Sequence, residues 1–251
     1  MTTTEFPLFI TPDWPEPPGV KAISTLRQGG ISLPPYQSFN LGSHVGDHSE
    51  AVKFNRERLA SEVGLSPGSV QWLKQVHGTR VIDVDQVVVD EIEADAAYTT
   101  RSGVACCIMT ADCLPVLFAS IDGSEVAVAH AGWRGLAGGV LENTLSCFTD
   151  PNRVVVWLGP AIGPDAFEVG DEVMEVFAEK NAKMADAFTA SAHQKGKWFA
   201  DIYLLARLTL NSAGISNVYG GQCCTFSDAD RFFSYRRDGV TGRMATLIWK
   251  N

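Results

Sequence analysis

The fold of this chain is decided in residues 104–139, which read VACCIMTADCLPVLFASIDGSEVAVAHAGWRGLAGG. One apolar run predicts a strand over 104–108, and a second predicts another strand over 114–119. Between them the chain is interrupted at Cys113, which has an aspartate before it and a proline two residues after it. The pattern therefore predicts two core strands separated by a turn that carries a cysteine.

The second half of this stretch predicts a third strand that leads into a glycine turn. Apolar side chains alternate over residues 125–130, so that His130 shares one face of the strand with two valines. Gly132 and Gly135 follow and mark a sharp turn. A helix is expected after it, over about residues 136–148.

Outside this stretch, strands and helices are interleaved without a strict strand–helix–strand repeat. The expected helices cover residues 52–63, 171–181 and 200–212, and the expected strands begin near residue 21 and cover 70–73, 80–84, 95–99, 154–158, 218–223 and 244–249. This order predicts the α/β class, with a mixed sheet in a single layered α/β domain. We expect one catalytic domain over residues 20–251, preceded by an irregular, proline-rich lead-in at 1–19.

The composition is typical of a globular enzyme. The 251 residues are long enough for a sizeable core, and 45% hydrophobic with 20% charged residues is ordinary. The formal net charge is −9. An acidic chain does not suit a protein that coats nucleic acid, because neutralising phosphates requires clustered Lys and Arg. No nucleic-acid partner is therefore expected.

Nothing in the sequence predicts export or membrane insertion. Residues 1–19 lack the basic and then apolar segments of a signal peptide, and the apolar run over 104–119 is interrupted by polar residues and a proline. Four of the six cysteines form adjacent pairs, Cys106–Cys107 and Cys223–Cys224, which do not suggest long-loop disulfides. We expect a cytoplasmic protein with reduced thiols and no membrane partner.

Three short segments each present one soft metal ligand. They are KQVHG with His77, TADCLP with Cys113 and HAGWRG with His130. Two imidazoles and one thiolate leave one corner of a tetrahedral site free, as in catalytic zinc centres. No segment has a second ligand at short spacing, so the fold must assemble the cluster. We predict that these three residues are both the zinc ligands and the catalytic residues, although each also fits a purely structural role.

A metal-free interpretation uses the same residues. Cys113 as a thiolate nucleophile with His130 as its base would form a hydrolase pair, and His77 would then be a bystander. A measurement of bound metal separates the two interpretations.

The glycine-rich turn AGWRGLAGG, residues 131–139, is a candidate anion site. Backbone N–H groups around Gly135, together with Arg134, suit a phosphate at the start of a helix. No GK[ST] follows, so the turn is not a Walker A loop. The alternative is a tight strand-to-helix turn in which Trp133 packs and Arg134 is solvated.

Two further segments are candidates for substrate contacts. In SFNLGSHVGDH, residues 38–48, Asn40 can both donate to and accept from a purine or ribose, and His44 is a plausible acid or anchor. Asp47 is better explained as a helix cap. The C-terminal FSYRRDGVTGR, residues 233–243, fits either an arginine clamp for a planar or anionic group or a structural ion-pair cluster.

These motifs carry a family resemblance. QVHG, MTADCLPV, AHAGWRG, VWLGPAIGPDAFEVG, FFSYRRDGVTGRMA and RQGGISLPPYQSFNLGSHVGDH are similar to the YfiH-type family, and the resemblance runs from about Gly19 to Trp249. Members are labelled laccase-domain polyphenol oxidoreductases, purine nucleoside phosphorylases or peptidoglycan-editing factors. The resemblance implies a fold similar to that of cytotoxic-necrotising-factor-type cysteine hydrolases.

The histidine count tests the first label. Four coppers would need roughly ten imidazoles, and the chain has 5 histidines. A conventional multicopper oxidase within one chain is therefore excluded. A single copper in the His–Cys site, with phenol oxidation as its consequence, remains an alternative to zinc.

The resemblance favours a zinc-dependent purine nucleoside phosphorylase. Its expected substrates are adenosine, inosine, guanosine and methylthioadenosine with phosphate, and adenosine deamination is expected as a side activity. The deaminase signature HxE…PCxxC is absent, so no glutamate can be assigned to that reaction. A peptidoglycan-precursor amidase using Cys113 and His130 or zinc-bound water is an alternative, and a non-enzymatic metal-binding module is another.

Overall fold

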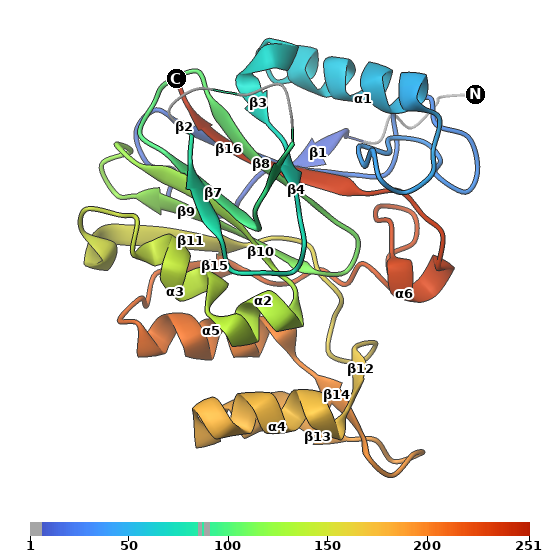
Figure 1. The fold of residues 1–251 in the computed structure, drawn as a ribbon, viewed down its shortest axis with the longest axis vertical. Coiled ribbons are helices and arrows are strands. Elements are labelled where there is room, and N and C mark those ends of the chain that lie inside the picture. Colours follow the sequence, from blue (N-terminus) through green and yellow to red (C-terminus); the bar gives the residue numbers. More distant parts are fainter. Residues whose placement is uncertain (1–6, 85–86, 88–90) are drawn as a thin grey trace.

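The computed structural model of the chain describes residues 7–84, 87 and 91–251. Two β-sheets pack face to face and are covered by helices on their outer sides, which gives four layers (Figure 1). A smaller unit of one helix and three short strands projects below the second sheet (Figure 1). The predicted α/β class with mixed sheets is confirmed.

The first sheet has five strands and is antiparallel except at one edge. In spatial order its strands are β1 (Phe9–Ile10), β2 (Val20–Thr25), β16 (Met244–Lys250), β8 (Ala105–Thr110) and β3 (Val70–Gln71). Only β3 runs parallel to its neighbour β8. Strand β1 lies within the expected irregular lead-in, where it pairs with β2, so this part of the lead-in is ordered on the sheet.

The second sheet has six strands and contains most of the stretch from which the sequence analysis began. In spatial order its strands are β15 (Val218–Gly220), β11 (Val154–Leu158), β9 (Leu114–Ser120), β10 (Val126–Ala131), β7 (Ala96–Thr99) and β5 (Val81–Asp83). The edge strands β15 and β5 are parallel to their neighbours, and the central strands are antiparallel. Strands β8, β9 and β10 confirm the three strands expected there.

Strand β10 is buried on both faces. Val126 and Val128 pack between the two sheets, against residues such as Ile108 of the first sheet. The alanines between them face the helices on the other side. Alternation thus assigned the faces correctly, but a strand in the middle of four layers has no solvent side.

Helices cover the two outer faces. Helix α1 (Ser49–Glu62) packs Leu59 against the first sheet, and the second sheet is covered by α2 (Trp133–Gly138), α3 (Val140–Leu145) and α5 (Ile202–Ser212) (Figure 1). The single helix expected over 136–148 is wrong in one respect. Gly139 adopts φ 101°, a left-handed conformation that ends α2 and begins α3.

The remaining elements are short. The projecting unit consists of α4 (Asp171–Lys180) and a sheet in the order β12 (Glu168–Gly170), β14 (Lys197–Ala200), β13 (Phe188–Ala190). Strands β4 (Leu73–Lys74) and β6 (Ile92–Glu93) form a separate pair. The other helices are α6 (Tyr235–Asp238) and 3-10 turns at Pro67–Ser69, Pro151–Arg153 and Ala182–Ala187. The small sheet was not expected from the sequence. No helix in the described part of the chain is long and apolar enough to cross a membrane.

Candidate metal centre between two cavities

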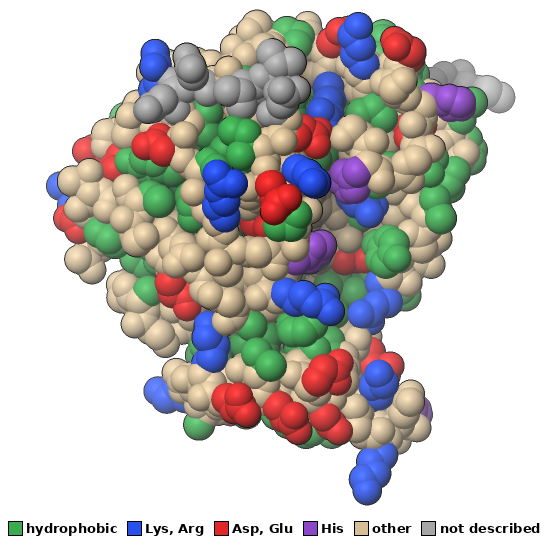
Figure 2. Space-filling view, in the orientation of Figure 1, with side chains coloured by type: hydrophobic (Ala, Val, Ile, Leu, Met, Phe, Trp, Pro, Cys, Tyr) green, Lys and Arg blue, Asp and Glu red, His purple; other side chains and the backbone are tan. Residues whose placement is uncertain are grey.

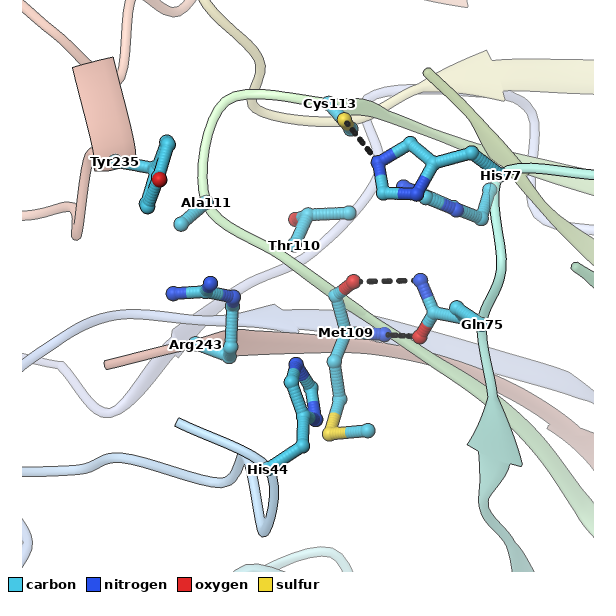
Figure 3. Close-up of a pocket in the computed structure, with 10 residues that line it drawn as sticks. His44, Gln75, His77, Met109, Thr110, Ala111, Cys113, Tyr235 and Arg243 are labelled. Carbon is cyan, nitrogen blue, oxygen red and sulfur yellow. Dashed lines mark hydrogen bonds between the residues drawn. The ribbon is translucent and has the colours of Figure 1, made fainter. Parts of the chain in front are cut away.

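The fold brings the three predicted ligands together at one edge of the second sheet. His77 lies in the turn between β4 and β5, Cys113 in the turn between β8 and β9, and His130 near the end of β10. Their ligand atoms all lie within 4.8 Å of one another, and His77 Nε2 is 3.8 Å from Cys113 Sγ (Figure 3). This is the one group of three or more potential ligands found in the described residues.

Unusual backbone conformations place two of these ligands. His77 has φ 60°, and Asp112, directly before Cys113, has φ 95°. Left-handed conformations are uncommon for residues other than glycine and collect at functional sites, where the surrounding structure must hold them. Asp112 is held by hydrogen bonds that its carboxylate accepts from the Thr225 hydroxyl at 2.6 Å and the Arg236 N–H at 2.7 Å.

A buried aspartate, Asp95, holds two of the three ligands, His77 and His130. It is 0% exposed, and its carboxylate accepts hydrogen bonds from the backbone N–H groups of residues 76–78, which form the His77 turn. Its Oδ1 is also 2.8 Å from Nδ1 of His130. With the Nδ1 proton donated to Asp95, the Nε2 lone pair of His130 is left free for a metal. Asp95 was not predicted as a site residue, because its one signal in the sequence is a carboxylate at the start of an apolar strand.

The three ligands are electrostatically coupled. Burial alone would raise the pKa of Cys113, but the adjacent imidazoles of His130 and His77 outweigh burial and lower the pKa to about 6. Burial alone would lower the pKa of His130, but the Cys113 thiolate and Asp95 outweigh it and raise the pKa. The geometry therefore stabilises a thiolate, which is the form of cysteine that binds metal or attacks as a nucleophile.

The cluster fits a metal that keeps one open position. One side of it is enclosed by Gly132, where a Cβ atom would lie 2.9 Å from Cys113 Sγ and 3.1 Å from a ring carbon of His77. The other side faces solvent-filled space, since His77 is exposed and Cys113 is half-buried. Two nitrogen donors, one sulfur donor and an open side match catalytic zinc sites.

The smaller of two cavities opens on the cluster, and its volume is about 350 Å³. The residues around it are polar or sulfur-containing for the most part; they include His44, Gln75, Met109, Thr110, Tyr235 and Arg243 (Figure 3). Gln75 is fixed, because its side-chain amide donates to the carbonyl of Met109 at 2.8 Å and accepts from the N–H of the same residue at 2.7 Å. Histidine and arginine side chains gather around the hollow on this face (Figure 2).

The larger cavity adjoins the cluster on its other side and has a volume of about 440 Å³. Its wall comes from α2 and from the projecting unit, and it combines apolar with charged side chains, including Trp133, Ile162, Phe167, Glu168, Glu172 and Lys197. His77, Ala111, Cys113 and Tyr235 line both cavities. The cluster is therefore the point at which the two cavities meet.

Asn40 does not contact either cavity, which corrects its expected role in substrate binding. It is 0% exposed, and its amide donates to the Gly42 carbonyl and to Asp47. Its Oδ1 accepts from the N–H groups of Gly42 and Arg243, both at 2.9 Å. All of its hydrogen-bonding capacity is used inside the protein. Asn40 therefore positions the backbone of Arg243.

The glycine turn also differs from its expected role. Gly135 is buried and lines neither cavity, because α2 approaches the His77 turn so closely that a Cβ atom would lie 2.9 Å from the carbonyl oxygen of Gly78. Arg134 lies at the larger cavity, exposed, with its guanidinium 4.4 Å from the Trp133 ring centroid. The structure thus supports the tight-turn interpretation for the glycine and leaves Arg134 beside the site.

His44 and the C-terminal arginines occupy different surroundings. His44 lies at the rim of the smaller cavity, where partial burial of its ring together with Arg243 lowers its pKa. Arg237 is structural, because its guanidinium donates to three backbone carbonyls and pairs with Asp238 at 2.8 Å. Arg236 donates to two carbonyls at the larger cavity, and Arg243 points into the smaller one (Figure 3). Within this motif, Arg237 is therefore structural, whereas Arg243 is a residue of the site.

Known proteins resemble this chain over nearly its whole length. Residues 21–251 match the family described as multi-copper polyphenol oxidoreductase laccase. The Escherichia coli (strain K12) protein named purine nucleoside phosphorylase YfiH is 52% identical over 241 residues, which cover 96% of this chain and 98% of that protein. A Neisseria meningitidis crystal structure superposes with a TM-score of 0.93 at 50% identity, covering 98% and 100%. The structure of YlmD from Geobacillus stearothermophilus gives 0.91 at 31% identity, covering 99% and 98%.

Proposed function

The chain belongs to the multi-copper polyphenol oxidoreductase laccase family, and from this premise we propose that it is a purine nucleoside phosphorylase acting at the His77–Cys113–His130 cluster. Relatives at 48–52% identity carry that enzyme name. The observation that carries the proposal is the meeting of two cavities at one cluster. Phosphorolysis joins two substrates at one carbon, and a site entered from two sides can hold both in reacting geometry.

The family's name refers to several copper ions, but the described residues of this chain do not form a multi-copper centre. Of the 5 histidines, only His77 and His130 join the cluster, and no second group of ligands occurs in the described residues. We propose zinc as the resident metal, with copper as the alternative, held by the two imidazoles and the Cys113 thiolate. When bound, the ion would supply Lewis-acid chemistry at the point where the two cavities meet.

The protein residues do the positioning. Asp95 fixes the ring of His130 and the His77 turn, so the donor atoms are preorganised. The larger cavity offers aromatic and apolar surface at Trp133 and Phe167, which suits the purine of adenosine, inosine, guanosine or methylthioadenosine. Arg134 stands at the same cavity for polar contacts with the nucleoside.

One observation favours a second candidate, a thiol hydrolase. Cys113, His130 and Asp95 form a chain in which the carboxylate orients the imidazole and the imidazole lowers the pKa of the thiol. This is the arrangement of a nucleophile, its base and an orienting acid. Such a site would cleave an amide, for example in a peptidoglycan precursor, without any metal.

Two measurements test the proposal together. Elemental analysis of protein purified without added metal should find about one zinc per chain. Incubation of inosine with that protein should release hypoxanthine and ribose 1-phosphate only when phosphate is present. Base release at the same rate without phosphate would mean hydrolysis. Metal-free protein that cleaves an amide of a muropeptide and leaves nucleosides intact would support the thiol hydrolase.

A further inference from the structure

We propose that Arg243 and Thr110 form the subsite that binds phosphate in the smaller cavity, with His44 at its rim. This inference rests on the proposed phosphorolysis, because it names the place of its second substrate. Arg134, the anion contact expected from the sequence, lies at the larger cavity, whereas Arg243 and Thr110 lie on the opposite side of the cluster.

Arg243 is held in place as a fixed cation. Its backbone N–H donates to Asn40, and its Nη1 donates to the carbonyls of Thr241 and Gly242, both at 3.0 Å. Its side chain passes over Gly42, where a Cβ atom would lie 2.8 Å from Cγ of the arginine. Only one nitrogen of the guanidinium is thereby used within the described residues. Its Nε and Nη2 donors remain for a ligand in the cavity.

Thr110 supplies a second, independent donor. It is 3% exposed, it lines the smaller cavity, and its hydroxyl makes no hydrogen bond with any residue that the structure describes. Figure 3 shows this hydroxyl pointing into the space between Tyr235 and the guanidinium of Arg243. The hydroxyl oxygen is not sealed inside the protein but open to the cavity, where a ligand or water can satisfy it. The two donors thus face one small volume next to the cluster.

The charge around this volume favours a dianion. No carboxylate lines the smaller cavity within the described residues. The carboxylates that act on its cations are already engaged: Glu91, near His44, is paired with Arg56 at 2.9 Å, and Asp112, near Arg243, accepts hydrogen bonds from Thr225 and Arg236. The larger cavity differs, because the carboxylates of Glu168 and Glu172 line it and would repel phosphate. Three cations also line it: Arg236, whose guanidinium donates to backbone carbonyls, Lys197, and Arg134, which is exposed and stacked on Trp133.

Calorimetric titration with inorganic phosphate tests the subsite without any turnover. The protein is used as purified, with its metal. Substituting Arg243→Met keeps the length of the side chain and should weaken phosphate binding by roughly 10- to 100-fold. The near-isosteric Thr110→Val should weaken it by roughly 3- to 10-fold. Arg134→Met removes the competing cation and should leave phosphate affinity within about twofold. Thermal melts and zinc content establish that each variant is folded and loaded.

Adenosine 5′-monophosphate is the comparison ligand, because a nucleotide carries the same dianion. Phosphate binding that depends on Arg243 and Thr110 supports the subsite, whether or not nucleosides are cleaved. If Arg134→Met abolishes phosphate binding and Arg243→Met does not, the assignment is overturned. It is also overturned if the nucleotide binds through Arg243 while free phosphate does not bind at all. Phosphate-dependent turnover unchanged in Arg243→Met would sink the subsite but leave the proposed function standing.

Discussion

The two cavities share one cluster, but their walls are built differently. Met109 and Thr110 of the smaller cavity come from the end of β8, inside the two-sheet sandwich. The larger cavity takes its outer wall from β12 and α4 of the projecting unit. Its opposite wall includes Trp133 at the start of α2. One half of the site is thus a small recess inside the sandwich, and the other half is a groove of apolar and charged side chains between two parts of the fold.

The cations of the two cavities show the same contrast. Arg243 is fixed through its backbone by the fully buried Asn40 and through its side chain by carbonyls. Arg134 makes no hydrogen bond with any described residue and rests on a tryptophan ring. A preorganised donor loses less entropy when it binds a small, symmetrical anion. A cation on a mobile stem suits a larger and more variable ligand such as a nucleoside.

The largest effect is expected from a substitution in the His77–Cys113–His130 cluster, which both cavities share. Cys113→Ala deletes one of three ligands. The loss of the Lewis acid should raise the activation free energy by about 4 kcal/mol, which lowers kcat/KM roughly 1000-fold. Bound zinc should fall to a small fraction of one per chain. The melting temperature measured on metal-free protein should hardly change, since Cys113 is half-buried in a turn.

Cys147→Ala is the matched control for that variant. Cys147 is also half-buried, follows α3, and takes no part in the cluster. It should keep its zinc and its activity. Full zinc occupancy in Cys113→Ala would remove the metal assignment, and retained amide cleavage in that variant would remove the thiol hydrolase as well.

The next largest effect is expected at Asp95, which orients two residues of the cluster. Asp95→Asn replaces a carboxylate that accepts from the His77 turn and from His130 by a group with one acceptor oxygen. Zinc affinity should fall by roughly 10- to 100-fold, as for other residues that orient a metal-bound imidazole. Competition with a chromogenic chelator measures it. Asp122→Asn, in the turn between β9 and β10, should bind zinc normally. Equal affinity in both variants would show that Asp95 does not orient the ligands.

A smaller effect separates the two cavities. Arg134→Met should raise KM for the nucleoside by roughly 3- to 10-fold, the loss of one charged contact at a partly solvated site. KM for phosphate should stay unchanged, because that substrate is assigned to the other cavity. Arg153→Met, an exposed arginine at the far end of β9, is the control for lost surface charge. A rise in the phosphate KM instead would merge the two cavities into one anion site.

The sequence predicts the central strands well, and it marks the three residues that the fold brings together, because both depend on local signals. Apolar runs mark β8, β9 and β11, and soft ligands in turns mark Cys113 and His77. The projecting sheet escaped prediction, since its strands are three or four residues long and lack alternation. The break at Gly139 escaped it too, because a glycine near the middle of a helical pattern does not by itself reveal a left-handed conformation.

The wrong and missed site residues have a common physical cause. Asn40 was identified as a polar group suited to a ligand, but whether it faces a cavity or the protein depends on Arg243, which is 203 residues away in the chain. Asp95 accepts hydrogen bonds from His77 and from His130, 18 and 35 positions away. A sequence shows which polar side chains can form hydrogen bonds or bind a ligand. Whether each contacts a ligand or another part of the protein depends on how the strands pack.

The smallest effect concerns Tyr235, the aromatic residue that lines both cavities. Its side chain is 61% exposed, its hydroxyl makes no hydrogen bond with a described residue, and its ring centroid lies 5.8 Å from the guanidinium carbon of Arg243. Tyr235→Phe keeps the ring between the cavities and should change both KM values by less than about twofold. Tyr235→Ala removes the partition and one cation–π contact, so both KM values should rise by roughly 2- to 5-fold. A rise for one substrate alone would show that the ring belongs to a single cavity. If the phenylalanine variant is as impaired as the alanine variant, the hydroxyl contacts a substrate, and the partition between the cavities is polar.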